Sequence, residues 1–295
     1  MSGVVVVTDS TSSLAPTLAE QPGLVTVPLQ VIVDGTSRPE SFRPGAGSIT
    51  PGAVAAALRE GRTVSTSRPS PEAFLSAYAA AVDAGATAIV SVHLSGAISG
   101  TCDAAAQAGR AAAVPVIVVD SRTVGPGCGL AAVAAAEAAR AGASAEEAAD
   151  VARRRAAASV TYFCVENLEY LRRGGRIGTA QALLGSALAV KPLLTVTDGR
   201  IGAKERVRTM SRALGRLEEL AVEALAGAGA AAGAGTGAGT GADVAVVHLD
   251  NRSTADRLAR VLERSTTSVT VTEVSAVLGV HCGPGTVGVV VVPRS

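Results

Sequence analysis

Short clusters of hydroxyl and acidic side chains follow several apolar runs in this sequence. They occupy residues 9–13, 65–70, 95–101 and 120–121, and a fifth cluster at 281–285 sets a histidine and a cysteine beside glycines. Hydroxyl groups and helix N-termini bind carboxylates and phosphates well, because they supply short donor bonds and the positive end of the helix dipole. The clusters therefore favour an anion-binding site. The same residue types also cap helices, and each cluster taken alone fits that structural role better than a ligand site.

Sequence motifs narrow the chemistry that these clusters can perform. The chain has no G-x-x-x-x-G-K-[ST] phosphate loop, no G-x-G-x-x-G after the first apolar run and no H-E-x-x-H segment, so nucleotide and zinc-hydrolase sites lose their usual support. One alternative is a serine-dependent hydrolase or acyltransferase, with Ser99 as nucleophile, His281 as base and Asp9 as orienting acid. Ser99 lacks the G-x-S-x-G elbow of many such enzymes. A second alternative is a sensor of a small anion such as a sugar phosphate, which needs no apolar tunnel.

The elements that must position these clusters alternate between strands and helices in the first half of the chain. β-Branched runs at Val4–Val7, Ala88–Val92 and Val116–Val119 are each followed by an alanine-rich stretch, which predicts an α/β lobe with a buried parallel sheet. We expect helices at Pro51–Arg59, Pro71–Ala84, Thr101–Ala113, Cys128–Ala141 and Ala145–Ala157.

A second α/β lobe is predicted from residue 159 onward, which divides the chain into lobes 1–158 and 159–295. The glycine-rich segment 227–241 is predicted to be a flexible loop, because it has too few side chains to offset its ordering entropy. We expect strands at Val160–Val165, Leu193–Thr197, Val244–His248, Val269–Val274 and Val287–Val292, and helices at Thr179–Ala189 and Thr209–Leu225.

Composition excludes several classes of partner. The 26 Lys and Arg nearly balance the 25 Asp and Glu, and only three Tyr and three Phe are present, so neither the charge nor the aromatic platforms of a nucleic-acid-binding protein are found. The four cysteines form no C-x-x-C pair, which predicts free thiols. No apolar run reaches the roughly 20 residues that a membrane span needs, and the N-terminus lacks signal-peptide features. We expect a cytoplasmic protein without an integral membrane segment.

Taken together and in order, the motifs resemble the DegV family of bacterial fatty-acid-binding proteins, the lipid-binding subunits of fatty acid kinase. The resemblance covers nearly the whole chain, and its segments lie at residues 8–12, 27–31, 66–71, 93–101, 168–178, 190–194 and 281–285. It implies a two-lobed DegV-like fold that binds one long-chain fatty acid, needs no cofactor and is not an enzyme by itself. It also implies a monomer that presents the fatty acid to a separate kinase, which forms an acyl phosphate for phospholipid synthesis.

The resemblance also assigns roles to particular residues. Thr66, Ser99 and His281 match the side chains that bind the carboxylate of the fatty acid, and Ser67 and Ser95 are their neighbours. Arg176, in the Gly-Gly-Arg turn, matches the arginine expected to contact the kinase. Two positions depart from the family pattern: Arg68 replaces a usual Gln, which adds a cation near the head group, and Cys102 stands where an aromatic residue is common.

Overall fold

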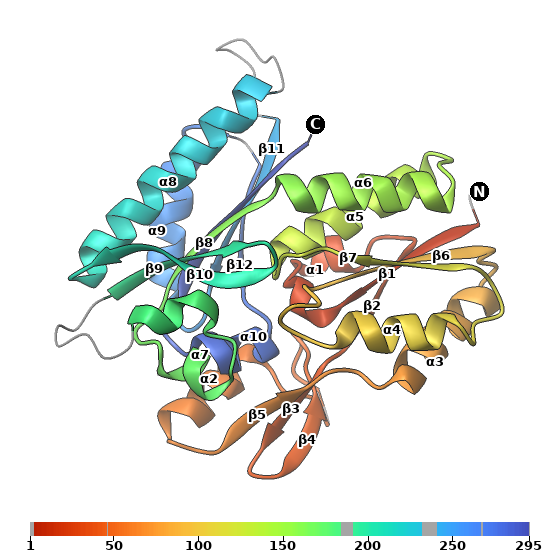
Figure 1. The fold of residues 1–295 in the computed structure, drawn as a ribbon, viewed down its shortest axis with the longest axis horizontal. Helices are drawn as coiled ribbons and strands as arrows, with labels where there is room; N and C mark the ends of the chain where they lie inside the picture. The colour runs from red at the N-terminus through yellow and green to blue at the C-terminus, as the bar shows by residue number, and fades with distance from the viewer. Residues whose placement is uncertain (1–2, 46, 184–190, 232–240, 267, 295) are drawn as a thin grey trace.

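The computed structural model describes residues 3–45, 47–183, 191–231, 241–266 and 268–294, and these form a mixed α/β fold with three sheets (Figure 1). The first sheet has the order β2-β1-β6-β7, and all its strands are parallel, as predicted. Its strands are β1 (Val4–Asp9), β2 (Leu24–Val27), β6 (Ala88–His93) and β7 (Val116–Asp120). Helices α3 (Pro71–Asp83) and α4 (Thr101–Gly109) cover one face, and α5 (Pro126–Arg140) and α6 (Ala145–Ala158) cover the other.

The second sheet has six strands in the order β10-β9-β8-β13-β11-β12, and only the β11–β12 pair is parallel. Its strands are β8 (Val160–Cys164), β9 (Lys191–Thr197), β10 (Arg200–Val207), β11 (Ala242–His248), β12 (Val269–Glu273) and β13 (Val287–Pro293). Helices α8 (Met210–Ala231) and α9 (Arg252–Leu262) pack on one face. Residues of β11 and β13 on the opposite face share a core with α5 and α6, so these two helices lie between the two large sheets.

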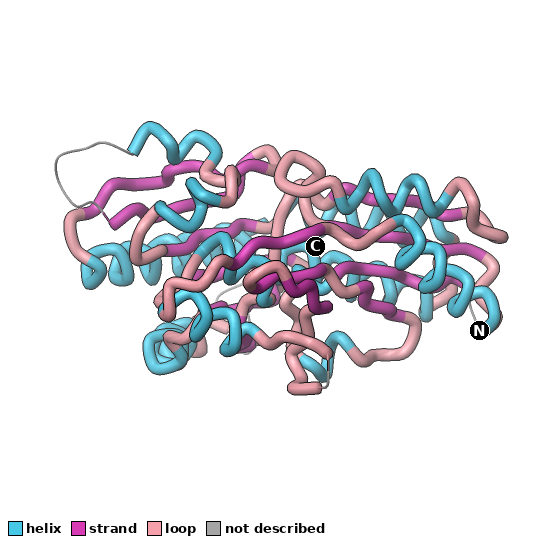
Figure 2. Tube along the Cα trace, turned by 90° about the horizontal axis from the view of Figure 1, so that it is seen from below, coloured by secondary structure: helices cyan, strands magenta, loops and turns pink. Residues whose placement is uncertain are grey.

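A third, small sheet links the two halves of the chain. Strands β3 (Gln30–Val33), β4 (Thr36–Pro39) and β5 (Val64–Ser67) are antiparallel in the order β4-β3-β5. Their apolar residues share a core with α2 (Pro51–Arg59) from the first half and α10 (Ala276–Cys282) from the second. Viewed from below, the strands of the N-terminal half run between rows of helices (Figure 2). The remaining short elements are η1 (Ser10–Ser12), α1 (Pro16–Ala19), α7 (Glu169–Arg173) and η2 (Gly178–Leu183).

Several predicted bounds differ from the structure, and the helix predicted at Thr101–Ala113 ends at Gly109. Helix α8 continues to Ala231 and takes up the first residues of the predicted loop 227–241, because alanine offsets the poor helix propensity of the interspersed glycines. Most of the rest of that segment lies outside the described residues. The predicted helix Thr179–Ala189 is a short 3₁₀ helix at Gly178–Leu183, and residues 184–190 are likewise not described. The two large sheets fall on either side of the predicted boundary at residue 158. Helix α10 follows this boundary in the sequence but packs against α2 and the small sheet, which precede it.

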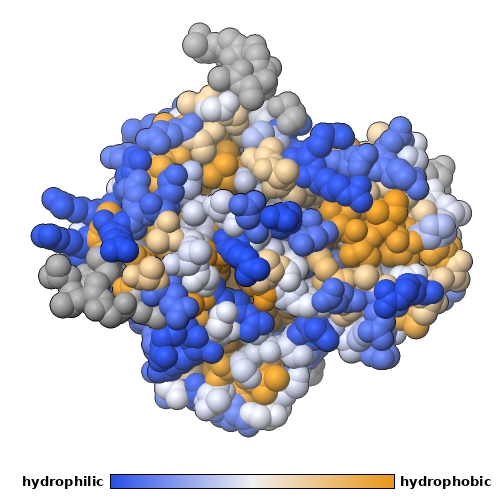
Figure 3. Space-filling view, in the orientation of Figure 1, coloured by the Kyte–Doolittle hydropathy of each residue, from blue (hydrophilic) through white to orange (hydrophobic). Residues whose placement is uncertain are grey.

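None of the helices in the described ranges is both long and apolar enough to cross a bilayer. The face seen in Figure 3 is largely hydrophilic, with an apolar area around the edge strand β7.

Candidate functional site

The side chains of Thr66 and His281 form one hydrogen-bonded pair. Thr66 lies on β5, where it pairs with Val31 of β3, and His281 is close to the end of α10. Because β3 and α10 share an apolar core, the C-terminal helix lies against the small sheet of the N-terminal half. Thr66 Oγ1 and His281 Nε2 are 2.9 Å apart. The structure therefore brings together two of the three principal residues predicted to bind a carboxylate.

His281 is held in its neutral form. Burial, and secondly the nearby Arg176 guanidinium, lowers the pKa of His281 to about 4. Its Nδ1 atom is buried and has no hydrogen-bond partner within the described part of the chain. A Cβ atom placed on Gly174 would lie 2.1 Å from Nδ1, so the ring packs against the backbone of that glycine. A neutral imidazole has one N–H donor and one acceptor nitrogen, and the hydrogen bond to Thr66 orients the ring.

Arg176 connects the turn after α7 to the loop that contains Ser99. Its Nε donates to the Ile98 carbonyl oxygen at 3.1 Å, and its Nη1 donates to the Gly174 carbonyl oxygen at 2.6 Å. Gly175 has a φ of +68°, a conformation that glycine adopts without strain. Arg176 consequently lies beside His281 and places a fixed positive charge at the same cavity.

An apolar cavity that is lined in part by His281 and Arg176 lies between the six-stranded sheet and the start of α5. Its volume is about 60 Å³, which is space for only a few water molecules. A long apolar chain fits only if the side chains lining the cavity move apart. The cavity is lined by Ile98, Val124, Gly125, Pro126, Thr161, Tyr162, Phe163, Arg176, Ile201, Val247, Val274, Leu278, His281, Cys282, Thr286 and Val290.

The other residues of the predicted site have different surroundings. The Ser99 hydroxyl lies 2.9 Å from that of Thr101, next to the Ile98 carbonyl that Arg176 contacts. Ser95 is fully buried and donates to the Gly199 carbonyl oxygen at 2.8 Å, which joins the two halves of the chain. Ser67 is exposed and donates to the backbone oxygen of Arg68. Roles for Ser67, Ser95 and Ser99 in carboxylate binding stay predictions.

The two departures from the family pattern, Arg68 and Cys102, lie near the loop that contains Ser99. A Cβ atom on Gly100 would lie 2.3 Å from Arg68 Nη1, so the Arg68 guanidinium contacts the loop that contains Ser99. Cys102 is half-buried beneath the loop, and its thiol donates to the Leu94 carbonyl oxygen. Burial, followed by the charges of Asp120, Asp9 and Asp103, raises the pKa of this thiol to about 12.

The alternative triad of Ser99, His281 and Asp9 is not formed. The Asp9 carboxylate is fully buried and lies 3.0 Å from His93 Nδ1, because β1 and β6 are neighbours in the parallel sheet. His93 Nε2 in turn lies 2.7 Å from the hydroxyl of Ser91. His281 contacts Thr66 rather than Ser99. The described residues also contain no group of His, Cys, Asp or Glu suited to hold a metal ion.

Sequence reasoning missed one buried carboxyl group. Glu40 is 6% exposed, accepts hydrogen bonds from the Ser10 hydroxyl and from Val277 N at 2.9 Å, and follows a strand that the sequence did not predict. Burial, which is the largest influence, raises the pKa of Glu40 to about 7. Because Glu40 lies in the polar stretch between Arg38 and Arg43, the sequence resembles a solvated loop, and no pattern there marks the residue as buried.

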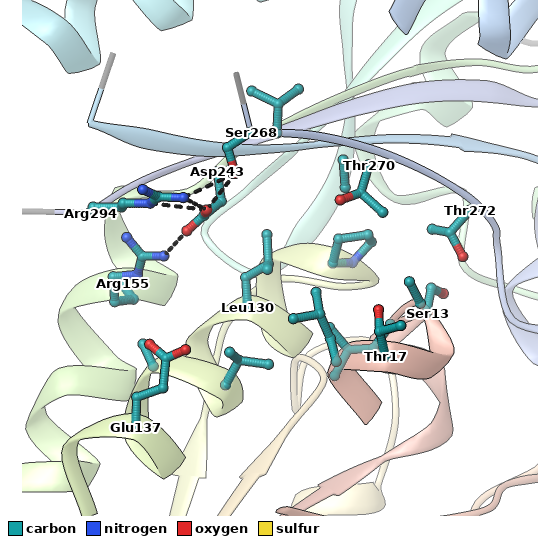
Figure 4. A pocket seen from close by; sticks show the side chains of 18 residues that line it. Ser13, Thr17, Leu130, Glu137, Arg155, Asp243, Ser268, Thr270, Thr272 and Arg294 are labelled. Carbon is teal, nitrogen blue, oxygen red and sulfur yellow. Dashed lines mark hydrogen bonds and ion pairs between the residues drawn. The ribbon is translucent and has the colours of Figure 1, made fainter. Parts of the chain in front are cut away.

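A larger cavity of about 580 Å³ opens between α1, α5 and α6 on one side and β11 and β12 on the other (Figure 4). At one end Asp243 accepts hydrogen bonds from both Arg155 and Arg294. Hydroxyl groups of Thr17, Thr270 and Thr272 line its other walls. This charged and hydroxylated lining suits an acyl tail less well than the cavity at His281 does.

Comparison with known sequences identifies the family. The profile described as "Uncharacterised protein, DegV family" matches residues 3–294. The chain belongs to the DegV family. A DegV domain-containing protein of Streptomyces coelicolor is 46% identical over 294 residues, which cover 99% of both chains. A DegV domain-containing protein of Deinococcus radiodurans is 36% identical over 293 residues, again 99% of both chains.

Solved DegV structures have the same fold. A fatty-acid-binding DegV family protein from Thermus thermophilus has a TM-score of 0.83 and 32% sequence identity, with 98% of this chain and 99% of that chain covered. DegV from Bacillus subtilis, described as a fatty acid binding protein, has a TM-score of 0.83 and 27% identity over 98% of both chains. The predicted family and fold class are thereby confirmed.

Proposed function

We propose that this DegV protein binds one long-chain fatty acid, with the carboxyl group beside Thr66 and His281 and the tail in the adjoining apolar cavity. The observation that carries the proposal is that His281 and Arg176 line one apolar cavity, and that His281 is bonded to Thr66. The fatty-acid-binding relatives from Thermus thermophilus and Bacillus subtilis support it.

The two parts of the ligand make different contributions. While the Thr66–His281 hydrogen bond is kept, the pair has one donor left for a carboxylate, either the Thr66 hydroxyl or Nδ1–H of the neutral ring, and such a bond to a charged group contributes about 1.5–3 kcal/mol. Each methylene buried in the cavity contributes about 0.8 kcal/mol, so a tail of roughly 14 methylenes has an upper bound near 11 kcal/mol. The tail therefore supplies most of the affinity, and the polar pair fixes the position of the carboxyl group.

We also propose that the bound carboxyl group is presented to a separate fatty acid kinase, which forms an acyl phosphate that feeds phospholipid synthesis. The end of α7 and the turn that follows it support a partner contact, since Arg172 and Arg173, the last residues of α7, expose more than half of their side chains. Arg176 lies on the same turn and also lines the cavity. We therefore assign to Arg176 the contact with both the kinase and the carboxyl end of the fatty acid. In this scheme the DegV protein performs no catalysis alone.

Native mass spectrometry of freshly purified protein tests ligand binding. We expect an added mass of one fatty acid, lost or strongly reduced in Thr66→Ala and His281→Ala. Thr270→Ala is the matched control, because Thr270 lines the separate polar cavity and should leave occupancy unchanged. A bare wild-type protein that takes up no added palmitate contradicts the proposal.

Trapping of acyl phosphate with hydroxylamine tests the kinase step. With the fatty acid kinase of the same organism and ATP, wild-type protein loaded with palmitate should yield acyl hydroxamate. Arg176→Ala should lower the yield more than Arg153→Ala, whose side chain lies on α6 and pairs only with Asp150 among the described residues. Equal yields from the two variants contradict a role for Arg176 in the kinase contact.

A further inference from the structure

Both ends of helix α10 are held by residues from the N-terminal half of the chain. Near its last turn, His281 is bonded to Thr66 of β5. At its first turn, Ser275 N donates to the Ser13 hydroxyl at 2.9 Å and Val277 N donates to Glu40 Oε2 at 2.9 Å. His281 lies four positions after Val277, about 6 Å along a helix. A displacement of the first turn is therefore transmitted to the histidine.

Glu40 is the only ionisable side chain that hydrogen-bonds to this first turn within the described residues. Its Oε1 accepts from the Ser10 hydroxyl, which itself accepts from Leu29 N at 2.8 Å. Its Oε2 accepts from Val277 N, one of the backbone N–H groups that a helix leaves without an internal partner. A carboxylate at this position also interacts favourably with the helix dipole. Ionised Glu40 thus joins η1 and the end of β4 to α10.

Protonation of Glu40 weakens this connection. A neutral carboxyl group accepts a hydrogen bond less strongly than a carboxylate, and its new O–H must be directed at Ser10 or at Val277, both of which already donate to it. Protons can reach the group, because Glu40 forms part of the wall of a cavity of about 320 Å³.

We propose that Glu40 is a positioning residue for the carboxylate site: in its ionised form it holds α10 so that His281 stays on Thr66, and its protonation loosens the site and releases the ligand. This inference rests on the proposed function. It makes fatty-acid retention depend on pH near neutrality, because burial raises the pKa of Glu40 to about 7.

The charged neighbours of Glu40 do not produce the same pH dependence of fatty-acid retention. Asp9, the nearest carboxylate, raises the pKa of Glu40 and is itself bonded to His93. Arg43 and Glu20 line the same cavity but form an ion pair with each other, and both side chains are more than half exposed. On α10 itself, His281 has a pKa near 4 and stays neutral between pH 6 and 8.5.

The first experiment measures the affinity for dodecanoate by isothermal titration calorimetry between pH 6 and 8.5, where the carboxyl group of this probe is ionised. We expect the wild-type affinity to rise about fivefold to tenfold with a midpoint near pH 7, the change expected when a neutral hydrogen bond becomes charge-assisted. Glu40→Gln should bind with a low and constant affinity over this range. Glu20→Gln is the matched control, because it removes an exposed carboxylate from the same cavity, and it should retain the wild-type profile.

The second experiment uses the ligand-free protein, so that failure of the proposed function and failure of this inference can be told apart. The chain has three histidines, and Glu40 should shift the ¹³C imidazole signal of His281 between pH 6 and 8.5. His281→Gln assigns the signal, and Glu40→Gln should abolish the transition. If dodecanoate does not bind at any pH, the proposed function is wrong, and this signal still decides the role of Glu40.

A His281 signal that stays constant in the wild type, or an identical transition in Glu40→Gln, overturns the inference. A thermal unfolding transition and an unchanged His93 signal confirm that Glu40→Gln is folded. Should Glu40→Gln fail to fold, Ser10→Ala replaces it. Loss of the Ser10 hydroxyl removes a hydrogen bond that lowers the pKa of Glu40, so the transition should move to higher pH. An unmoved transition in Ser10→Ala also counts against the proposal.

Discussion

Thr66 and His281 are 215 residues apart in the sequence, yet Thr66 Oγ1 lies 2.9 Å from His281 Nε2. The contact exists because α10 packs on the small sheet of the N-terminal half. In the sequence, α10 comes directly before β13, the last strand of the chain that the structure describes. The proposed carboxylate site is therefore a property of the packing between the two halves, and neither half contains it alone.

The Thr66 hydroxyl should matter more for binding than for folding. Thr66→Val keeps the shape of the side chain and removes the donor, so we expect fatty-acid affinity to fall by about tenfold, equivalent to roughly 1.4 kcal/mol. Thr66→Ser retains the hydroxyl and should bind nearly as well as the wild type. Displacement of a fluorescent fatty acid measures both variants. Equal affinities for Val and Ser variants would show that the hydroxyl does not contact the ligand.

His281 should make the protein less stable in mild acid. Its pKa is about 4 in the folded protein and 6.5 for the reference side chain, so the unfolded chain binds the extra proton between these values. The stabilisation from neutral His281 is present above about pH 6.5 and is lost as the pH falls toward 4. Chemical denaturation at several pH values should show a shallower loss of stability in His281→Gln than in the wild type. Parallel curves for the two proteins would contradict the low pKa of His281.

Gly174 should tolerate no side chain. A Cβ atom there would lie 2.1 Å from His281 Nδ1, so Gly174→Ala should push the ring from Thr66 and reduce fatty-acid binding severely. Gly215→Ala on α8 is the control, because a Cβ atom there meets nothing within 4 Å. That variant should bind normally and gain up to about 1 kcal/mol in stability from better helix propensity. Normal binding by Gly174→Ala would mean that the ring position is unimportant.

Ser95 should prove structural. Its hydroxyl is buried and donates to the Gly199 carbonyl oxygen, so Ser95→Ala leaves a buried acceptor without its partner at a cost of about 1–3 kcal/mol. We expect a lower midpoint of urea unfolding with an unchanged amount of bound fatty acid. A variant with normal stability and lost ligand would instead support the role that the family resemblance implied for Ser95.

The parts of the structure that the sequence predicts well have a strong local signal. Helix α2 has the predicted bounds because Thr50 caps its first turn and Pro51 follows. Strands β1, β6 and β7 are predicted because they consist largely of β-branched residues, and β1 and β6 are mostly buried in the sheet.

The missed elements lack such local signals. Strand β4 is short, mostly exposed and polar, so its sequence resembles a loop. Helix α10 contains two valines and a glycine within seven residues, and it forms because Ser275, Ser13 and Glu40 satisfy its first turn. Thr66, His281 and Arg176 could be named in advance only through the family resemblance. The contacts of His281 with Gly174, and of Glu40 with Val277, depend on long-range packing that no local pattern encodes.

The position of α10 near the C-terminus has a consequence for how the protein is made. During synthesis the N-terminal half emerges first and can form its parallel sheet while His281 is still untranslated. A nascent or truncated chain that ends before α10 thus has Thr66 without its partner, and it lacks one wall of the apolar cavity. Under the proposed function, a fatty acid can consequently be held only after α10 has docked, so a chain that carries lipid is one whose C-terminal elements are in place.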